Sequence, residues 1–299
     1  MRRTFLLGTV LSIAACSPTP GEGPPQEPVP QYTDGPPYPA PDPAAIARFR
    51  AWQDRLALPA VYLEPAGPAS ATPGGSRIGG PVWLAATEQW PTDAKVGPMT
   101  FLAQIDFAAL PPLPDFPRSG VLQFFIGHDM NYGADFQRPD RGTFRVIYRR
   151  DFDDAGSLRA SPVRVPGTDF LAPIDGTTVT RGVALKGSAG TSKPTINHWQ
   201  LARDLPDIVE RRGRGRVIAL LDERFVERPE RHHIGGHPEF VQDDWRYRPS
   251  ERRADRVLLN MWSRDGAMWG DAGQGQFLIA REDLLKRDFS KVFYAWDSS

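Results

Sequence analysis

Leu122-Gln123-Phe124-Phe125-Ile126 recurs as Gly275-Gln276-Phe277-Leu278-Ile279 near the end of the chain. Both segments are rich in aromatic and aliphatic residues, which is typical of β-strands. Three further pairs of similar segments surround them in the same order, and only the intervening loops differ in length. These pairs are Ile78-Gly79-Gly80 with Ile234-Gly235-Gly236, Leu102-Ala103-Gln104-Ile105 with Leu258-Leu259-Asn260-Met261, and Val146-Ile147-Tyr148 with Val292-Phe293-Tyr294. Four matches in one order indicate an internal duplication.

The duplication predicts two similar β-rich halves, about residues 77–151 and 233–297, that pack about a pseudo-twofold axis in one core. The middle segment, residues 152–232, is less regular. The fold class that we expect is α+β, a single sheet-dominated domain.

Helices are expected at few places. Thr195–Arg212 has helical patches interrupted by Pro206, because proline breaks a helix interior. A strand is expected at Val217–Leu221 and a short helix at Glu282–Asp288.

The domain begins with a helix. Asp42 is a good N-cap, and Pro43 suits the first helical position. Pro59 ends the pattern, and the domain is expected to span residues 44–299. The apolar residues of this helix recur at spacings that place them on one face: Ile46, Phe49, Trp52 and Leu56.

The first residues resemble an export signal. Arg2 and Arg3 precede the apolar run Phe5–Ala15, whose 11 residues would rise about 16 Å as a helix and cannot span a bilayer core of about 30 Å. We interpret residues 1–15 as a signal peptide. The run ends at Cys16, as in the bacterial lipobox, so Cys16 is the expected lipidation site; the alternative is ordinary cleavage beside an incidental cysteine.

Residues 16–43 then form a tether. Between Ser17 and Pro43, 11 of 27 residues are proline, which predicts an extended spacer that reaches about 80 Å. Arg2-Arg3 leaves Sec and twin-arginine export both open. Ser17 lacks the aspartate that retains many lipoproteins at the inner membrane, which favours a lipid anchor in the outer membrane, facing the periplasm.

Composition excludes several classes of protein. Thirty-six basic residues balance 36 acidic ones, which argues against a nucleic-acid binder. A single cysteine excludes a disulfide framework and a four-cysteine zinc site. The run Arg211–Arg216 could bind an anionic surface or be a solvated helix end. No cofactor is expected.

Several motifs together resemble the YwqG family, a bacterial family of unknown function. They are IGGPVW (78–83), WP (90–91), FLAQIDF (101–107), GVLQFFI (120–126), IGGHPEFVQDD (234–244), MWGDAGQGQFLI (268–279) and RDFSKVFYAWD (287–297). The resemblance covers residues 77–297 and implies a two-lobed, β-rich fold without an established activity. Members often occur as lone cytoplasmic proteins and sometimes near toxin genes. The expected lipoprotein signal departs from that pattern.

The glycine-rich loop Trp269–Gly275 has two interpretations. It is a tight turn in which glycines supply positive φ and Asp271 bonds the backbone. Alternatively it is a ligand loop, with Trp269 as a wall and Asp271 as the polar contact. Phosphate binding is not expected, because no Lys-Ser/Thr follows and the next segment is a strand.

Histidines and acids cluster near the second glycine pair. Because adjacent strand residues face opposite sides, only one of His232 and His233 could join His237 in a metal site with Asp243 or Asp244. Without a specific spacing, we expect loop and edge residues around Gly235-Gly236, and no metal.

Glutamines inside apolar strands need hydrogen-bond partners. They could connect the two halves or line a shared pocket at the pseudo-twofold axis. Two aspartates follow them, and paired acids can perform acid–base chemistry. The glutamines are Gln104, Gln123, Gln242 and Gln276, and the aspartates are Asp106 and Asp243. The candidate ligand-facing residues are Gln104, Asp106, Gln242, Asp243, Trp269 and Asp271.

No nucleophile motif is present, so no catalytic residue is assigned. We expect a lipid-anchored envelope module that binds an unknown protein or small molecule, and not nucleic acid. The resemblance adds protection against a toxin as one form of this role. The alternative is an envelope hydrolase that uses Asp106, Asp243 and Asp271, with or without a metal at His237.

Overall fold

The computed structural model describes residues 42–152, 155–163, 172–208, 210–212, 215–217 and 230–298. Contacts divide the chain into Met1–Tyr38 and Pro39–Ser299, and every described residue belongs to the second unit. The expected signal peptide, Cys16 and most of the tether lie outside the described residues. None of the described helices is long and apolar enough to cross a membrane.

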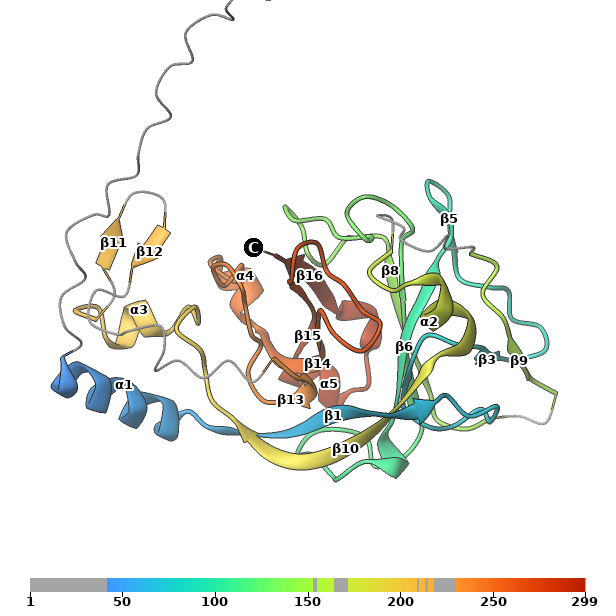
Figure 1. Ribbon diagram of the computed structural model, residues 1–299, viewed down its shortest axis with the longest axis horizontal. Helices are drawn as coiled ribbons and strands as arrows, with labels where there is room; N and C mark the ends of the chain where they lie inside the picture. The colour runs from blue at the N-terminus through green and yellow to red at the C-terminus, as the bar shows by residue number, and fades with distance from the viewer. Residues whose placement is uncertain are drawn as a thin grey trace, which may run out of the picture. The chain divides into compact units, whose positions relative to one another are not determined.

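Ten strands form one large antiparallel sheet that nearly closes on itself (Figure 1). Two long strands occupy its centre, β1 (Leu58–Pro68) and β10 (Val183–Ser192). A first strand set continues the sheet on one side: β2 (Arg77–Ile78), β6 (Thr100–Asp106), β7 (Val121–Ile126) and β8 (Phe144–Arg149). A second strand set continues it on the other: β13 (His232–Gly235), β14 (Ala254–Trp262), β15 (Gln274–Ala280) and β16 (Phe293–Asp297).

The remaining elements are short. Three two-stranded sheets pair β3 (Val82–Leu84) with β9 (Ser157–Arg159), β4 (Thr92–Asp93) with β5 (Gly97–Pro98), and β11 (Glu210–Arg212) with β12 (Gly215–Val217). The helices are α1 (Pro43–Arg55), α2 (Gly176–Arg181), α3 (Leu201–Asp204), α4 (Pro249–Arg252) and α5 (Arg281–Leu285), with 3-10 turns η1 (Phe107–Ala109) and η3 (Phe289–Lys291).

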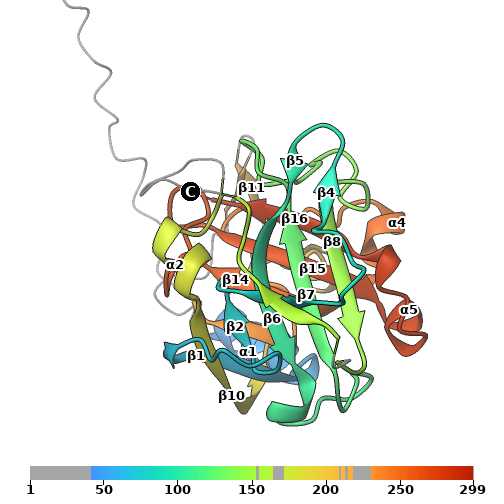
Figure 2. The ribbon, with the colours of Figure 1, turned by 90° about the vertical axis from the view of Figure 1, so that its right-hand side faces the viewer.

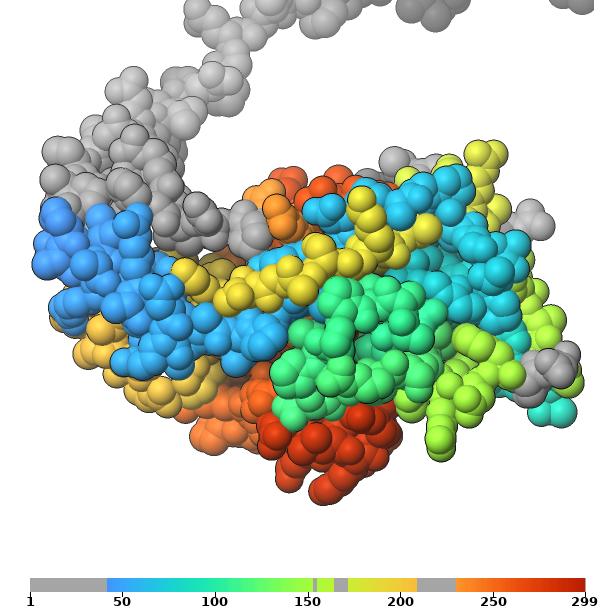
Figure 3. Space-filling view, turned by 90° about the horizontal axis from the view of Figure 1, so that it is seen from below, coloured from blue at the N-terminus to red at the C-terminus, as the bar shows by residue number. Residues whose placement is uncertain are grey.

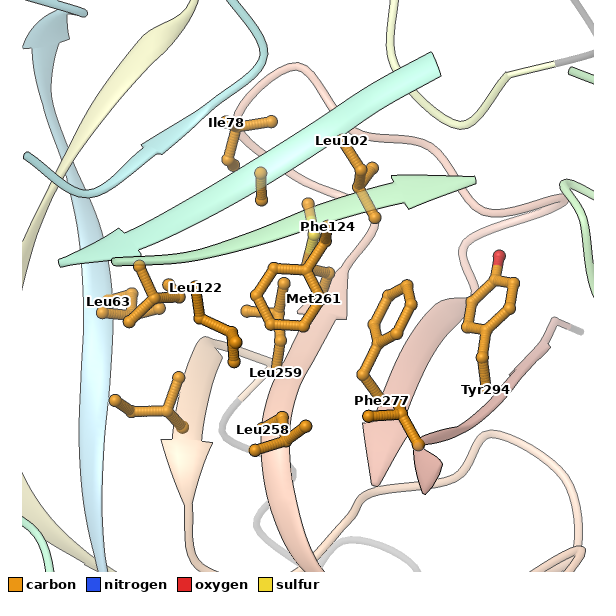
Figure 4. Close-up of a cluster of buried hydrophobic side chains, with 14 of the residues drawn as sticks. Leu63, Ile78, Leu102, Leu122, Phe124, Leu258, Leu259, Met261, Phe277 and Tyr294 are labelled. Carbon is orange, nitrogen blue, oxygen red and sulfur yellow. The ribbon is translucent and has the colours of Figure 1, made fainter. Parts of the chain in front are cut away.

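The two strand sets face each other across one core (Figures 1 and 2). Strand alternation decides which residues enter it. Phe124 of β7 and Phe277 of β15 meet with ring centroids 4.9 Å apart, and Tyr294 stacks on Phe277 at 4.4 Å (Figure 4). Gln123 and Gln276, one residue away, must therefore face outward from this core. The sheet-dominated fold expected from the sequence is confirmed.

Each glycine pair stands at the end of the first strand of its set and adopts a left-handed conformation. Gly79 and Gly80 have φ of 59° and 76°, and Gly235 and Gly236 have φ of 66° and 69°. A side chain at Gly79 would meet the Thr178 carbonyl, so the position has no room for a larger residue. The conformation and the close approach both require glycine.

Helix α1 confirms the predicted start of the domain. The Asp42 carboxylate accepts the Ala44 N–H at 2.9 Å, and Pro43 opens the helix. Phe49 and Trp52 of α1 pack with Ile196 and Leu201 in a cluster of their own.

The middle of the chain differs from the sequence expectation. Residues 152–232 contain β10, which pairs with β1 along almost its whole length. In Thr195–Arg212 only Leu201–Asp204 is helical, and α5 begins at Arg281 and ends at Leu285. Val217 ends β12, and residues 218–221 lie outside the described residues.

The segment from Phe107 to Gly120 closes one end of the core. Leu110, Leu113 and Phe116 are buried in the same cluster as Phe124 and Phe277. In Figure 3 this green segment lies against yellow β10 and the red segment around α5. The Asp115 carboxylate accepts two hydrogen bonds from the Arg281 guanidinium, at 2.8 and 2.9 Å, which joins the first strand set to the second.

Candidate functional site

Buried polar side chains line the outer face of the first strand set. Gln123 donates to the Gln104 amide oxygen at 3.0 Å and to the Trp83 carbonyl at 3.1 Å, and its own amide oxygen accepts from the Arg149 Nε at 2.6 Å. Gln104 donates to the carbonyls of Pro73 and Gly75, both at 2.9 Å. These bonds hold the covering segments onto the sheet.

Arg77 completes this network. Its buried guanidinium donates to five backbone carbonyls, those of Ser70, Thr72, Pro73, Gly74 and Pro81. Burial lowers the pKa of Arg77 from its usual value, and arginine stays charged well above neutral pH. A permanent cation therefore organises the loop that precedes β2.

The outer face of the second strand set is also polar but less completely satisfied. Gln276 donates to the Glu239 carbonyl at 3.1 Å and to the Asp297 carboxylate at 3.0 Å, while its amide oxygen has no partner among the described residues. Asn260 donates to the Gln274 amide oxygen at 2.8 Å, and in the same part of the chain the Gln274 amide nitrogen has no partner.

These bonds correct the expected role of the glutamines. The hydrogen bonds of Gln104 and Gln123 stay within the first strand set and its covering segments, and those of Gln276 stay within the second. They neither connect the two sets nor line a pocket between them, because alternation turns them away from the shared core. Gln242 is exposed and donates to the Ser298 carbonyl at 2.6 Å.

His232 and His233 lie in β13, inside the sheet between β1 and β14, and not at an edge as expected. His237 lies in the loop after Gly236, as expected, and all three side chains are buried. His232 accepts the Trp262 N–H at 3.1 Å. His233 lies against the carbonyls of Arg231 and His237, at 3.2 and 3.1 Å. Nε2 of His237 lies 2.6 Å from the Leu56 carbonyl, beyond the end of α1.

Burial lowers the pKa of three buried histidines, His198, His232 and His237. Desolvation lowers the pKa of His232 and of His237 to about 4, and that of His198 well below its usual value. Neutral imidazoles at physiological pH suit metal binding. However, the described part of the chain contains no group of three histidine, cysteine or acidic side chains that could hold a metal ion.

The candidate aspartates lie in different environments. The Asp106 carboxylate accepts the N–H groups of Gly75 and Ala108, at 2.8 and 3.0 Å, and so caps η1. Asp243 and Asp271 are exposed, in loops of the second strand set. The neighbouring Asp244 is buried and forms an ion pair with Arg246 at 2.7 Å.

The loop Trp269–Gly275 is a tight turn. Gly270 and Ala272 have φ of 53° and 52°, and the Gly273 N–H donates to the Trp269 carbonyl at 2.8 Å. Trp269 is not a wall of an open pocket, since its ring is buried in the core against Tyr132 and Tyr294, with centroids 5.9 and 6.2 Å away. Asp271 lies at the exposed tip of the turn.

Two candidate loops meet at the end of β16. The Val241 and Gln242 N–H groups donate to the Asp297 carboxylate, each at 2.8 Å. A side chain built on Gly270 would meet Ser298 and the Trp296 ring. The structure therefore brings the loops of Gln242, Asp243, Trp269 and Asp271 together, and separates them in the sheet from Gln104 and Asp106 of the first set.

Exposed apolar side chains gather around the same strand end. The Trp296 ring contacts Tyr132 and Phe136, with centroids 4.9 and 5.6 Å away, and its Nε1 donates to the Asn131 carbonyl. Five large apolar side chains of the described residues are exposed: Met130 (68%), Phe136 (45%), Tyr247 (58%), Met268 (57%) and Leu285 (48%).

All but Leu285 belong to segments that meet here. Met130 and Phe136 lie on the β7–β8 loop, and Arg248, next to Tyr247, donates to the Gln137 carbonyl at 2.9 Å. Met268 precedes the turn that packs on Trp296. We call Met130, Phe136, Tyr247, Met268 and Trp296 the Trp296 patch. Sequence reasoning did not find it, because single exposed methionines and aromatics do not form a motif.

One family is identified by comparison with known proteins, and no curated protein matches the chain. The family's sequence model matches residues 76–298, from one residue before β2 to the residue after β16, and excludes α1 and β1. The chain belongs to the family described as a domain of unknown function, DUF1963.

Proposed function

We propose that this protein is a lipid-anchored interaction module of the bacterial envelope and that the Trp296 patch is its contact surface. The expected signal peptide, Cys16 and the proline-rich tether supply the anchor and the reach. The YwqG-like motifs agree with a module that has no established chemistry. Toxin protection is one form that such a contact could take.

The observation that carries the proposal is the distribution of exposed apolar side chains. Four of the five large ones among the described residues lie on segments that meet at Trp296, and one of them, Phe136, contacts its ring. Aromatic and methionine side chains are enriched in protein interfaces, and contiguous exposed apolar surface on a soluble domain usually marks a binding site. The polar residues that the sequence suggested for chemistry are largely engaged in holding the sheet.

Photo-cross-linking tests the contact surface. The full-length protein, expressed in its own host, carries a photoreactive phenylalanine analogue in place of Phe136, or in place of Leu285 as the matched exposed apolar control. We expect a discrete cross-linked species from position 136 and none from position 285. The proposal is wrong if position 136 gives no species or if both positions give the same ones.

Fractionation tests the anchor separately. The full-length protein should sediment with the membrane fraction, and Cys16→Ser should move it to the soluble fraction. Release of the protein without any change at Cys16 would contradict lipid anchoring. This outcome does not depend on the Trp296 patch.

We also propose that the two strand sets are halves of an internal repeat, related by a pseudo-twofold axis. Support comes from the mirrored strand order on either side of β1 and β10 and from the left-handed glycine pair in each set. Gln104 lies opposite Gln123, and Asn260 lies opposite Gln276. When Gln123 is aligned with Gln276, the strand pairings align Val146-Ile147-Tyr148 with Tyr294-Ala295-Trp296. This segment begins two residues after Val292, where the segment matched by sequence begins.

A further inference from the structure

The segments that carry the Trp296 patch contain more acidic than basic residues. The segments that carry it are residues 129–141, 241–251, 268–273 and 296–298. They contain eight acidic residues and four arginines. The acidic residues are Asp129, Asp135, Asp140, Asp243, Asp244, Glu251, Asp271 and Asp297, and the arginines are Arg138, Arg141, Arg246 and Arg248.

Each of these arginines already has a carboxylate partner on the same segment. The nitrogen–oxygen distances are 3.1 Å for Arg138–Asp135, 3.8 Å for Arg141–Asp140, 2.7 Å for Arg246–Asp244 and 3.1 Å for Arg248–Glu251. The positive charges of these four arginines are therefore balanced locally. Arg252, the last residue of α4, lies over the Trp199 ring at 4.6 Å and donates to the Tyr247 carbonyl.

Asp129 and Asp271 lie on two loops that contact Trp296, and neither has a cationic partner among the described residues. Asp129 accepts only backbone N–H groups, those of Asn131 and Gly133, at 2.8 and 3.0 Å. Asp271 is exposed at the tip of the turn whose Gly270 packs against the Trp296 ring. Two of the loops that meet at the half-buried Trp296 ring therefore carry a carboxylate without a cationic partner in the described part of the chain.

The combination of aromatic rings and carboxylates indicates which kind of partner the Trp296 patch binds. A lysine or arginine side chain can lay its aliphatic stem and cationic head on an aromatic ring while its charge pairs with a nearby carboxylate. A carboxylate-rich partner would be repelled by the same carboxylates, which gives specificity by charge. Phe136 and Trp296 supply the rings, and Asp271 and Asp129 supply the charge.

We propose that the Trp296 patch binds a basic segment of a partner protein, in which arginine or lysine residues alternate with apolar ones. This inference rests on the proposed function and specifies the chemistry of its partner. The apolar residues of the segment cover Met130, Phe136 and Met268. Its cations lie over the aromatic rings, within reach of Asp271.

The test uses the full chain in a non-ionic detergent and a defined probe. The probe is a fluorescent twelve-residue peptide with four arginines and four leucines, and its twin carries glutamate at every arginine. Fluorescence anisotropy at low salt should show saturable binding of the basic peptide. The acidic twin should not bind, and added salt should weaken binding because it screens exposed charges.

Variants assign the binding to the patch. Phe136→Ser should weaken binding at least tenfold, and Asp271→Asn about threefold or more. Asp151→Asn is the matched control, since Asp151 is an exposed acid beyond the opposite end of β8, and it should bind as the parent does. Equal binding of the two peptides, no binding of the basic one, or full binding by Phe136→Ser overturns the proposal.

Different results would reject the contact surface and the basic partner. A cross-link from position 136 without binding of the basic peptide would retain the contact surface and reject a basic partner. Loss of the cross-link would reject the surface itself, whatever the peptides do.

Discussion

The first and second strand sets share a hydrophobic pattern but stabilise their outer faces with different chemistry. Arg77 and Arg149 provide permanent cations in the first set, where the Gln123 amide is fully bonded. In the second set the residue that precedes Ile234 and the glycine pair is His233, where the first set has Arg77. Asp297 accepts a hydrogen bond from the Gln276 amide nitrogen, and the Gln276 amide oxygen has no donor among the described residues. Similar strands can therefore carry networks of different completeness and different sensitivity to pH.

Loss of Arg77 should have the largest effect. Arg77→Ala removes the hydrogen bonds to five backbone carbonyls, of which that of Pro73 keeps a second donor, Gln104, and we expect a loss of about 3 to 5 kcal/mol in the free energy of unfolding. His233→Ala removes contacts to only two carbonyls and should cost about 1 to 3 kcal/mol. Urea unfolding measures both losses of free energy. An equal or larger loss for His233→Ala would contradict the expected difference between the two strand sets.

The second strand set should make stability depend on pH. His232 and His237 bind a proton near pH 6.5 when unfolded but only near pH 4 when folded. Acid therefore favours the unfolded chain, and stability that is complete above pH 6.5 should be lost as pH falls toward 4, by up to about 3 kcal/mol per histidine. The lowered carboxylate pKa values, such as that of Asp115, act only below about pH 3.8.

Replacing the two histidines isolates this effect. His237→Gln keeps a donor for the Leu56 carbonyl, and His232→Asn keeps an acceptor for the Trp262 N–H. The double variant should lose stability less steeply between pH 6.5 and 4 in thermal melts. An unchanged slope would assign the acid sensitivity to other groups.

The two outward glutamines should differ by a smaller amount. Gln123→Leu leaves the Arg149 Nε and the Gln104 oxygen without partners. Gln276→Leu breaks two hydrogen bonds, against three for Gln123→Leu, and removes an oxygen that has no donor among the described residues. We expect Gln123→Leu to cost about 1 to 2 kcal/mol more in urea unfolding. A larger cost for Gln276→Leu would mean that its oxygen has a partner, such as a buried water.

The smallest effect is expected at Phe136, which is exposed and belongs to the Trp296 patch. Phe136→Ser removes one ring contact with Trp296 and should change the unfolding free energy by less than about 1 kcal/mol. Thermal unfolding beside the parent protein measures this change. A larger loss would make the ring a structural element and weaken its assignment to a contact surface.

Some of this structure could be predicted from sequence because its signals are local. The N-cap at Asp42, the glycine pairs and the apolar cores of β7 and β15 each follow from a few neighbouring residues. The central strands were missed because β1 contains Pro59, Pro65 and Pro68, and β10 is rich in glycine, alanine and serine. Their pairing with each other outweighs weak local preferences.

The candidate site was harder to predict, for a different reason. Polar residues in apolar strands look functional in a sequence, but Gln104 and Asp106 are bound to backbone groups of their own strand set. The Trp296 patch is assembled from four segments that are distant in sequence, so its side chains carry no common spacing. Of the two residues suggested at the glycine-rich turn, Asp271 is exposed at its tip, while Trp269 lies in the core.

The central claim is that buried polar residues hold the fold while exposed apolar residues make the contact. A paired measurement of unfolding free energy tests it most directly. Gln123→Ala and Phe136→Ser are compared in the same urea titration. We predict a loss of about 2 kcal/mol or more for Gln123→Ala and less than about 1 kcal/mol for Phe136→Ser. A larger loss at Phe136 than at Gln123 would contradict the claim.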